Sequence, residues 1–188
     1  MDEIRGLLWS GSINVQITAK PSLLIAGVGQ NEGSINLRVP RNTYLPISLP
    51  LIKNLLKDFL RVDLDDKSRF VWFEFENVPL YWNYPVGVLF DSMVGLNPSE
   101  RQHKDTPLSL YIWKIELSCG TQVPTGVIPL VGGLEQIRSY WMHQWKQACF
   151  ILNGSAKQMM SLSMQDSQKF WESITKRDRE SFELISAR

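Results

Sequence analysis

Residues 70–93 read FVWFEFENVPLYWNYPVGVLFDSM, and this stretch decides the fold of the chain around it. Its first half alternates between two faces, with Val71, Phe73 and Phe75 on one and Trp72, Glu74 and Glu76 on the other. A period of two predicts a strand with one buried face. The two glutamates are predicted to be solvated rather than to form an acid/base pair. A tryptophan on that same face predicts that part of it is covered.

The second half of the stretch predicts a turn, a short strand and a short helix. Asn77 interrupts the alternation and favours a turn. Residues 78–82 read as a second strand, which Pro79 restricts to a sheet edge. Asn83 is predicted to cap a helix with Pro85 near its first turn. The apolar positions of that helix follow at helical spacing: Val86, Leu89, Phe90 and Met93. This order is expected in the middle of a ubiquitin-like fold.

The flanking sequence completes one domain. A short helix is predicted at residues 2–8, and strands at 12–18 and 35–39, joined through the glycine-rich segment 27–33. A helix opening at Pro46 and Pro50 carries an apolar stripe, namely Leu51, Ile52, Leu55, Leu56, Phe59 and Leu60. Residues 94–107 are predicted to be a mobile loop, and a closing strand spans 108–117. We therefore expect an α+β chain whose residues 1–118 form a ubiquitin-like β-grasp domain.

The composition changes after this domain. Residues 119–133 contain Pro124, Pro129 and four glycines and are predicted to be a linker. No proline follows, and residues 134–188 are predicted to be a helix-rich domain. The first helix carries one apolar face: Leu134, Ile137, Trp141, Trp145, Ala148 and Leu152. Asn153-Gly154 predicts its end, and Ser163 with Asp166 predicts the cap of a later helix that runs past Arg179.

Composition and charge exclude several classes of protein. Twenty basic against nineteen acidic residues leave a net charge of +1, which does not favour nucleic-acid binding. Two cysteines, Cys119 and Cys149, do not make a disulfide framework and fit a reducing cytosol. The start MDEIRGLLW does not resemble a signal peptide, and no apolar run reaches the roughly 20 residues that cross a bilayer. We expect a soluble cytoplasmic protein whose membrane contact is peripheral.

No catalytic constellation is evident. His103 lies in the predicted loop, and His143 reads as a surface residue that could in principle accept a proton. The two cysteines lack the C-x-x-C spacing of a zinc or redox site. Gly27 and Gly29 lie between strands with no helix to receive a phosphate. Neither a metal nor a cofactor is expected.

Four segments resemble the autophagy protein 5 family, most closely its budding-yeast members. They are WFEFENVPLYWNYPVGVLFD at 72–91, LLWSGSINVQI at 7–17, VPRNTYLP at 39–46 and HQWKQACFILNGSAKQMMSLS at 143–163. The resemblance runs from about residue 4 to about residue 185 and is weaker at 24–34 and 94–135. It implies an N-terminal ubiquitin-like domain followed by a helix-rich domain.

The resemblance also implies a role. In this family the lysine of the HQWKQ segment, here Lys146, accepts an isopeptide bond from the C-terminal glycine of a ubiquitin-like modifier, autophagy protein 12. Autophagy protein 7 activates the modifier and the E2-like autophagy protein 10 transfers it. The conjugate then acts like an E3, through autophagy protein 3, in joining autophagy protein 8 to phosphatidylethanolamine at the preautophagosomal membrane. Autophagy protein 16 binds through a coiled-coil segment.

Further expectations follow from this resemblance. The protein is a substrate of the pathway and not itself an enzyme. Asn83, Gln144 and Gln147 lie in or beside the diagnostic segments and are candidates for an E3-like surface. Family members continue into a second ubiquitin-like domain, so we expect a chain truncated before it. Two alternatives stay open: an unconjugated ubiquitin-like binding module and, less favoured, a small metabolic enzyme.

Overall fold

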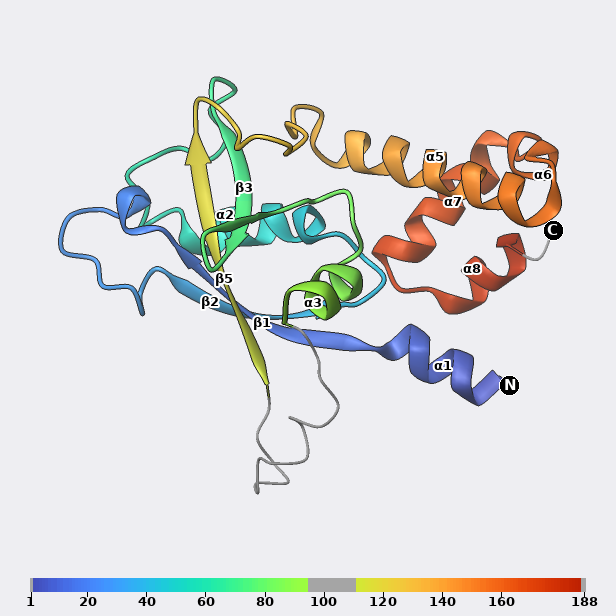
Figure 1. Cartoon of the computed structure of the whole chain (residues 1–188), viewed down its shortest axis with the longest axis horizontal. Helices are drawn as coiled ribbons and strands as arrows, with labels where there is room; N and C mark the ends of the chain where they lie inside the picture. Colours follow the sequence, from blue (N-terminus) through green and yellow to red (C-terminus); the bar gives the residue numbers. More distant parts are fainter. Residues whose placement is uncertain (1, 95–110, 187–188) are drawn as a thin grey trace. The chain divides into compact units, whose positions relative to one another are not determined.

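The computed structural model describes residues 2–94 and 111–186, which divide into two compact units, Met1–Val131 and Gly132–Arg188 (Figure 1). The first unit contains a sheet and helices, and the described part of the second contains helices only. The mixed α+β class predicted from the sequence is therefore confirmed. Each unit is described by itself below.

The described part of the first unit contains five strands and several short helices. In chain order they are α1 (Asp2–Ser10), β1 (Ser12–Ala19), η1 (Pro21–Leu23), β2 (Ser34–Pro40), η2 (Leu45–Ser48), α2 (Leu49–Leu56), β3 (Phe70–Phe75), β4 (Val78–Leu80), α3 (Val86–Val94) and β5 (Ile112–Gly120). The strand order in the sheet is β2-β1-β5-β3-β4. The first and last strands, β1 and β5, run parallel side by side near its centre, and every other pair is antiparallel.

One face of this sheet carries the core. Side chains alternate strictly along β1, so that Ile13, Val15 and Ile17 are buried. Trp113, Ile115 and Leu117 of β5 lie on the same face, since Ile17 is the register partner of Ile115. Ile52 and Leu56 of α2 and Leu89 of α3 join this cluster. Each such side chain contributes about 1.5–3 kcal/mol on burial.

The turn after β3 is a two-residue hairpin. Phe75 pairs with Val78, and the residues between them, Glu76 and Asn77, have φ values of 49° and 64°. Two consecutive positive φ angles are typical of a type I′ turn, whose twist matches that of the flanking strands. The predicted turn and the predicted edge strand are both confirmed. The strand ends at Leu80 and not at residue 82, because Trp82 turns inward and donates its Nε1–H to the Ile128 carbonyl at 2.7 Å.

The N-terminus of α3 is held by the segment that follows β2. The amides of Val86 and Gly87 donate to the carbonyls of Thr43 and Arg41, each at 2.8 Å. The Arg41 side chain forms an ion pair with Asp91. Two of the segments that carry the family resemblance, 39–46 and 72–91, are thus joined by backbone hydrogen bonds. The predicted cap by Asn83 is wrong, because the carbonyl of Pro85 accepts the first hydrogen bonds of the helix and Asn83 lies in the preceding turn.

Two other predictions need correction. The apolar stripe of α2 is only half buried, because Leu51 and Leu55 point away from the core and are 49% and 45% exposed. The helix also ends at Leu56, and Leu60 instead forms an isolated bridge to Leu24. The closing strand, predicted at 108–117, is observed at Ile112–Gly120. Residues 108–110 lie outside the described part of the chain. Residues 95–107 of the predicted loop lie outside it as well.

The segment predicted as a linker belongs largely to the first unit. Cys119 and Gly120 are the last residues of β5. After them Val127 is buried, and Gly126 lies against the Tyr81 ring, so that a Cβ at Gly126 would be 3.2 Å from the Tyr81 hydroxyl oxygen. The change to helices follows directly, at Gly132.

The second unit comprises α5 (Gly133–Asn153), α6 (Lys157–Met160), α7 (Met164–Thr175) and α8 (Arg179–Ser186). The predicted cap of α7 is confirmed, because the Ser163 hydroxyl accepts from the Asp166 amide at 3.0 Å. The prediction that this helix runs past Arg179 is wrong. Arg177 has a φ of 60°, which ends the helix, and the Asp178 carboxylate accepts from the Ser181 amide at 3.1 Å and starts the next one.

Candidate functional site: an exposed lysine on an anchored helix

Both ends of helix α5 are fixed by local interactions. At its start the Gln136 side-chain oxygen accepts from the Gly132 amide at 2.9 Å. At its end Gly154 adopts the left-handed conformation with a φ of 67°, as the Asn153-Gly154 pair predicts. Leu134 and Leu152, predicted on the buried face, are 46% and 80% exposed. The contact surface of α5 is therefore confined to its middle.

An aromatic cluster holds that middle portion. Trp141 stacks on Trp145 with ring centroids 6.0 Å apart, and both rings meet Phe170 of α7 edge-on at 4.9 and 5.0 Å. Trp145 also meets Phe182 of α8 at 5.6 Å. Figure 1 shows α7 and α8 gathered against α5. Edge-on aromatic pairs contribute about 0.5–1.5 kcal/mol each beyond their buried area, so the cluster sets the rotation of α5 about its axis.

Lys146 lies outside this cluster, roughly 100° around the helix from Trp145. It directly follows Trp145 and is exposed to solvent. Within the described chain it forms no ion pair, whereas Lys53 and Lys176 are each paired with a carboxylate. The ammonium group of Lys146 is therefore open to approach from solvent.

The neighbours of Lys146 on α5 include polar residues, and one apolar residue, Phe150, lies one turn later and is 61% exposed. His143 lies one turn earlier, and its Nε2 is 3.0 Å from Nε2 of Gln147. Gln144 is exposed, and Cys149 is half-buried with a free thiol. The prediction that His143 is a surface residue is confirmed, whereas His103 lies outside the described residues.

Asn83 belongs to the first unit. It lies half-buried in the turn between β4 and α3 and takes part in an interaction of its own. Gln144 and Gln147 lie on α5 of the second unit. The polar surface predicted from these three residues thus draws on both units, and it stays a prediction.

Glu74 corrects an expectation from the sequence. It is 6% exposed rather than solvated, and its carboxylate accepts from Trp72 Nε1 at 2.6 Å, from Ser118 Oγ at 2.9 Å and from Lys20 Nζ. Burial raises the pKa of Glu74, but the hydrogen bonds from Lys20, Trp72 and Ser118 outweigh it and hold the pKa below its ordinary value. Trp72, two residues earlier on the same strand face, is the one sequence signal of this network.

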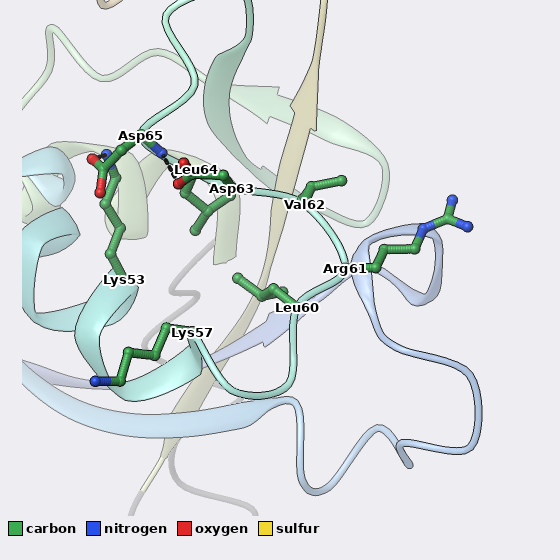
Figure 2. Close-up of a pocket in the computed structure, with 8 residues that line it drawn as sticks. All are labelled: Lys53, Lys57, Leu60, Arg61, Val62, Asp63, Leu64 and Asp65. Carbon is green, nitrogen blue, oxygen red and sulfur yellow. Dashed lines mark hydrogen bonds and ion pairs between the residues drawn. The ribbon is translucent and has the colours of Figure 1, made fainter.

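The first unit also has a shallow hollow beside α2 (Figure 2). Lys53 pairs there with Asp65 at 2.5 Å, and Arg61 Nε donates to the Ser22 carbonyl at 2.7 Å. Lys57 and Asp63 are its other charged residues, and Leu60, Val62 and Leu64 supply apolar lining. No group of three potential metal ligands occurs in residues 2–94 and 111–186, and no helix there is long and apolar enough to span a bilayer.

Comparison with known proteins assigns both units. Residues 8–119 match the family model described as "Autophagy protein ATG5, UblA domain", and residues 134–188 match the model described as "Autophagy protein ATG5, alpha-helical bundle region". Together the two models cover most of the chain.

Individual relatives agree with the family models. The chain is 49% identical to autophagy protein 5 of Vanderwaltozyma polyspora and 43% identical to that of Saccharomyces cerevisiae, in each case over 99% of the chain and 64% of the relative's length. The crystal structure of Kluyveromyces marxianus Atg5 superimposes with a TM-score of 0.87 at 38% identity, covering 100% of this chain and 68% of that one. The chain thus spans just under two thirds of the length of the curated relatives it matches, and it belongs to the autophagy protein 5 family.

Proposed function

We propose that this chain is the acceptor and scaffold of a ubiquitin-like conjugation reaction in autophagy. Lys146 receives the C-terminal glycine of autophagy protein 12 as an isopeptide, after activation by autophagy protein 7 and transfer by autophagy protein 10. The observation that supports the proposal is an exposed lysine, without an ion pair among the described residues, on a helix that aromatic packing anchors. This lysine lies within the HQWKQ segment, which is part of one of the four segments that carry the family resemblance.

The chemistry of aminolysis explains why position matters. An alkyl ammonium with the ordinary lysine pKa of about 10.4 is neutral in only about one molecule in a few thousand at pH 7. A lysine chosen from several must therefore be held at near-attack distance from the thioester, where effective molarities of roughly 10⁵ M or more become accessible. Fixing the helix on which Lys146 sits restricts the positions that its amine can reach.

The proposal is tested by replacing the acceptor. Lys146→Arg keeps the charge but cannot form the isopeptide, so a reaction reconstituted from autophagy proteins 7, 10 and 12 is expected to yield no conjugate. Lys157→Arg, an exposed lysine on neighbouring α6, is the matched control and should react normally. Normal yield from Lys146→Arg would refute Lys146 as the acceptor.

The later steps are proposed on the same basis. The conjugate acts like an E3 toward autophagy protein 3, and Asn83, Gln144 and Gln147 contribute to the surface that engages it. Autophagy protein 16 binds through its coiled-coil segment and brings the complex to the preautophagosomal membrane. With alanine at the three positions the conjugate should still form, and lipidation of autophagy protein 8 should be lower when equal amounts of conjugate are compared. Unaltered lipidation would make them ordinary surface residues.

The alternative function is an unconjugated ubiquitin-like binding module. Mass spectrometry of the protein isolated from cells distinguishes the two functions. Only an acceptor gives a branched peptide, and the branch should lie at Lys146.

A further inference from the structure

We infer that His143 is the proton acceptor for Lys146 when this lysine attacks the thioester, and that Gln147 positions the imidazole ring. The inference rests on the proposed function. It adds that the acceptor chain itself supplies a catalytic group and is not only a passive nucleophile.

Helix geometry places these residues together. His143 precedes Lys146 by three positions, and residues three apart are neighbours on a helix surface, with Cβ atoms about 5–6 Å apart. Both side chains lie on the side of α5 away from the tryptophan cluster and are exposed. The imidazole and the amine can therefore meet the same incoming thioester.

No carboxylate on α5 competes for the role. The helix contains a single acidic residue, Glu135, which lies about three turns before Lys146 and pairs with Arg138 at 3.3 Å. The other titratable group one turn from Lys146 is the Cys149 thiol, and it is half-buried. His143 is thus the exposed base that this helix offers to its lysine.

Charged groups of the packed helices do not engage His143. Helices α7 and α8 contact α5 through the ring cluster, across the helix from His143. Within these helices Glu172 pairs with Lys176 and Arg179 with Glu183, and no ion pair among the described residues involves His143. On α5 the ionisable residues one turn from His143 are Tyr140 and Lys146, and α6 contributes only Lys157.

Gln147 explains how the ring is held. The amide group of Gln147 lies 3.0 Å from Nε2 of the ring. With the amide rotated so that Oε1 accepts from Nε2–H, the free lone pair is on Nδ1, and this nitrogen takes the proton of Lys146. Nε2 remains a donor to Oε1 after Nδ1 is protonated. One glutamine can therefore hold both the neutral and the protonated ring.

The proton balance of the step is as follows. The neutral amine of Lys146 attacks the thioester carbonyl carbon, the C–N bond forms, and the C–S bond breaks as the thiolate leaves. The surplus amine proton passes to His143 and from there to the departing thiolate. Imidazole is suited to this transfer because it titrates near neutral pH.

The test is a single-turnover transfer assay at saturating E2-like enzyme, charged with the modifier as a thioester, over pH 5.5–9. Wild-type chain should show a rate that rises through the range in which histidine titrates. His143→Asn, which cannot take up a proton, should be about 100-fold slower at pH 7 and lose that inflection. Gln147→Ala should be less impaired than His143→Asn and should keep the dependence on pH. Ser139→Ala, on the same exposed side of α5, should match wild type.

Two results would overturn the inference. One is an unchanged transfer rate for His143→Asn. The other is a transfer rate for His143→Asn that is lower than that of wild type by the same factor at every pH, which indicates a structural role. Circular dichroism of each variant checks that the helices remain. Lys146→Arg runs in parallel. If it still accepts the modifier, the proposed function fails; if it does not and His143→Asn behaves as wild type, only the role of His143 fails.

Discussion

At the scale of single residues, Glu74 is a buried carboxylate that contributes to the stability of the first unit. Its carboxylate receives three hydrogen bonds, and the donors come from three strands or their ends: Lys20 after β1, Trp72 on β3 and Ser118 on β5. A buried carboxylate without such partners would cost several kcal/mol. Glu74 therefore links β1, β3 and β5 through side-chain hydrogen bonds on one face of the sheet.

Glu74→Gln is expected to destabilise the first unit by about 1.5–3 kcal/mol at pH 7, because hydrogen bonds to a charged group are lost. Since the pKa of Glu74 is lowered in the folded state, its contribution is present above the ordinary value of 4.5 and is lost as pH falls through the folded pKa. Hydrogen exchange of β3 and β5 amides, corrected for intrinsic rates, should show the difference between wild type and variant shrinking below pH 4.5. The exposed neighbour Glu76→Gln is the control and should stay within about 0.5 kcal/mol.

At the scale of elements, α3 shows how a distant loop sets a helix terminus. The first amides of a helix have no partner within it, and here the carbonyls of Arg41 and Thr43 supply two of them. The close approach requires Gly87, because a Cβ there would be 3.0 Å from both the carbonyl oxygen and Cβ of Arg41.

The sign of one substitution tests this junction. Glycine to alanine inside a helix ordinarily stabilises by about 0.5–1 kcal/mol, but Gly87→Ala should destabilise the first unit by about 1–3 kcal/mol through overpacking. Hydrogen exchange of the α3 and β1 amides would measure it. If the variant is more stable than wild type, the backbone at Arg41 can move away from the added methyl group without a loss of folding free energy. Val88→Ala, next in the helix and 51% exposed, should change little.

Sequence patterns predict the strands and turns of this chain better than they predict which side chains are exposed and which distant residues are in contact. Alternation in β1 and β3 and the turn at Asn77 give the correct hairpins, because strand period and turn chemistry are local. The exposure of Leu51 and Leu55 is not predictable in this way, since adjacent apolar residues on a helix widen the stripe beyond what the core can cover. Lys20, one of the three hydrogen-bond donors to Glu74, is 54 residues away in the sequence. No local sequence pattern predicts a contact over that separation. Lys146 is singled out only by family resemblance, since an exposed lysine on a helix is commonplace.

At the scale of the whole molecule, the described chain divides into a sheet unit and a helical unit that are each internally packed. Relatives such as that of Saccharomyces cerevisiae are longer, and this chain spans 64% of that protein. The packing of each unit is satisfied by its own residues, as the sheet core and the ring cluster show.

On the proposed function, we predict that residues 1–188 fold and bind the coiled-coil segment of autophagy protein 16 more weakly than Saccharomyces cerevisiae autophagy protein 5, of which they span 64%. The reason is that the partner groove in this family is expected to draw on a second ubiquitin-like domain. Isothermal titration calorimetry of both proteins against the same coiled-coil peptide would measure the difference. Equal affinity would show that the first two domains suffice.

The parallel pairing of β1 with β5 has a consequence for how the chain acquires its structure. Ile17 and Ile115 are register partners although roughly one hundred residues separate them, and closing so long a loop is entropically costly before any contact rewards it. During synthesis the two hairpins, β1–β2 and β3–β4, emerge early but have no strand between them. The centre of the sheet can assemble only after β5 has left the ribosome, whereas α5 to α8 meet through short-range contacts. The helical unit should therefore reach its packed state faster than the sheet, and the waiting hairpin edges are the part of the nascent chain most exposed to aggregation.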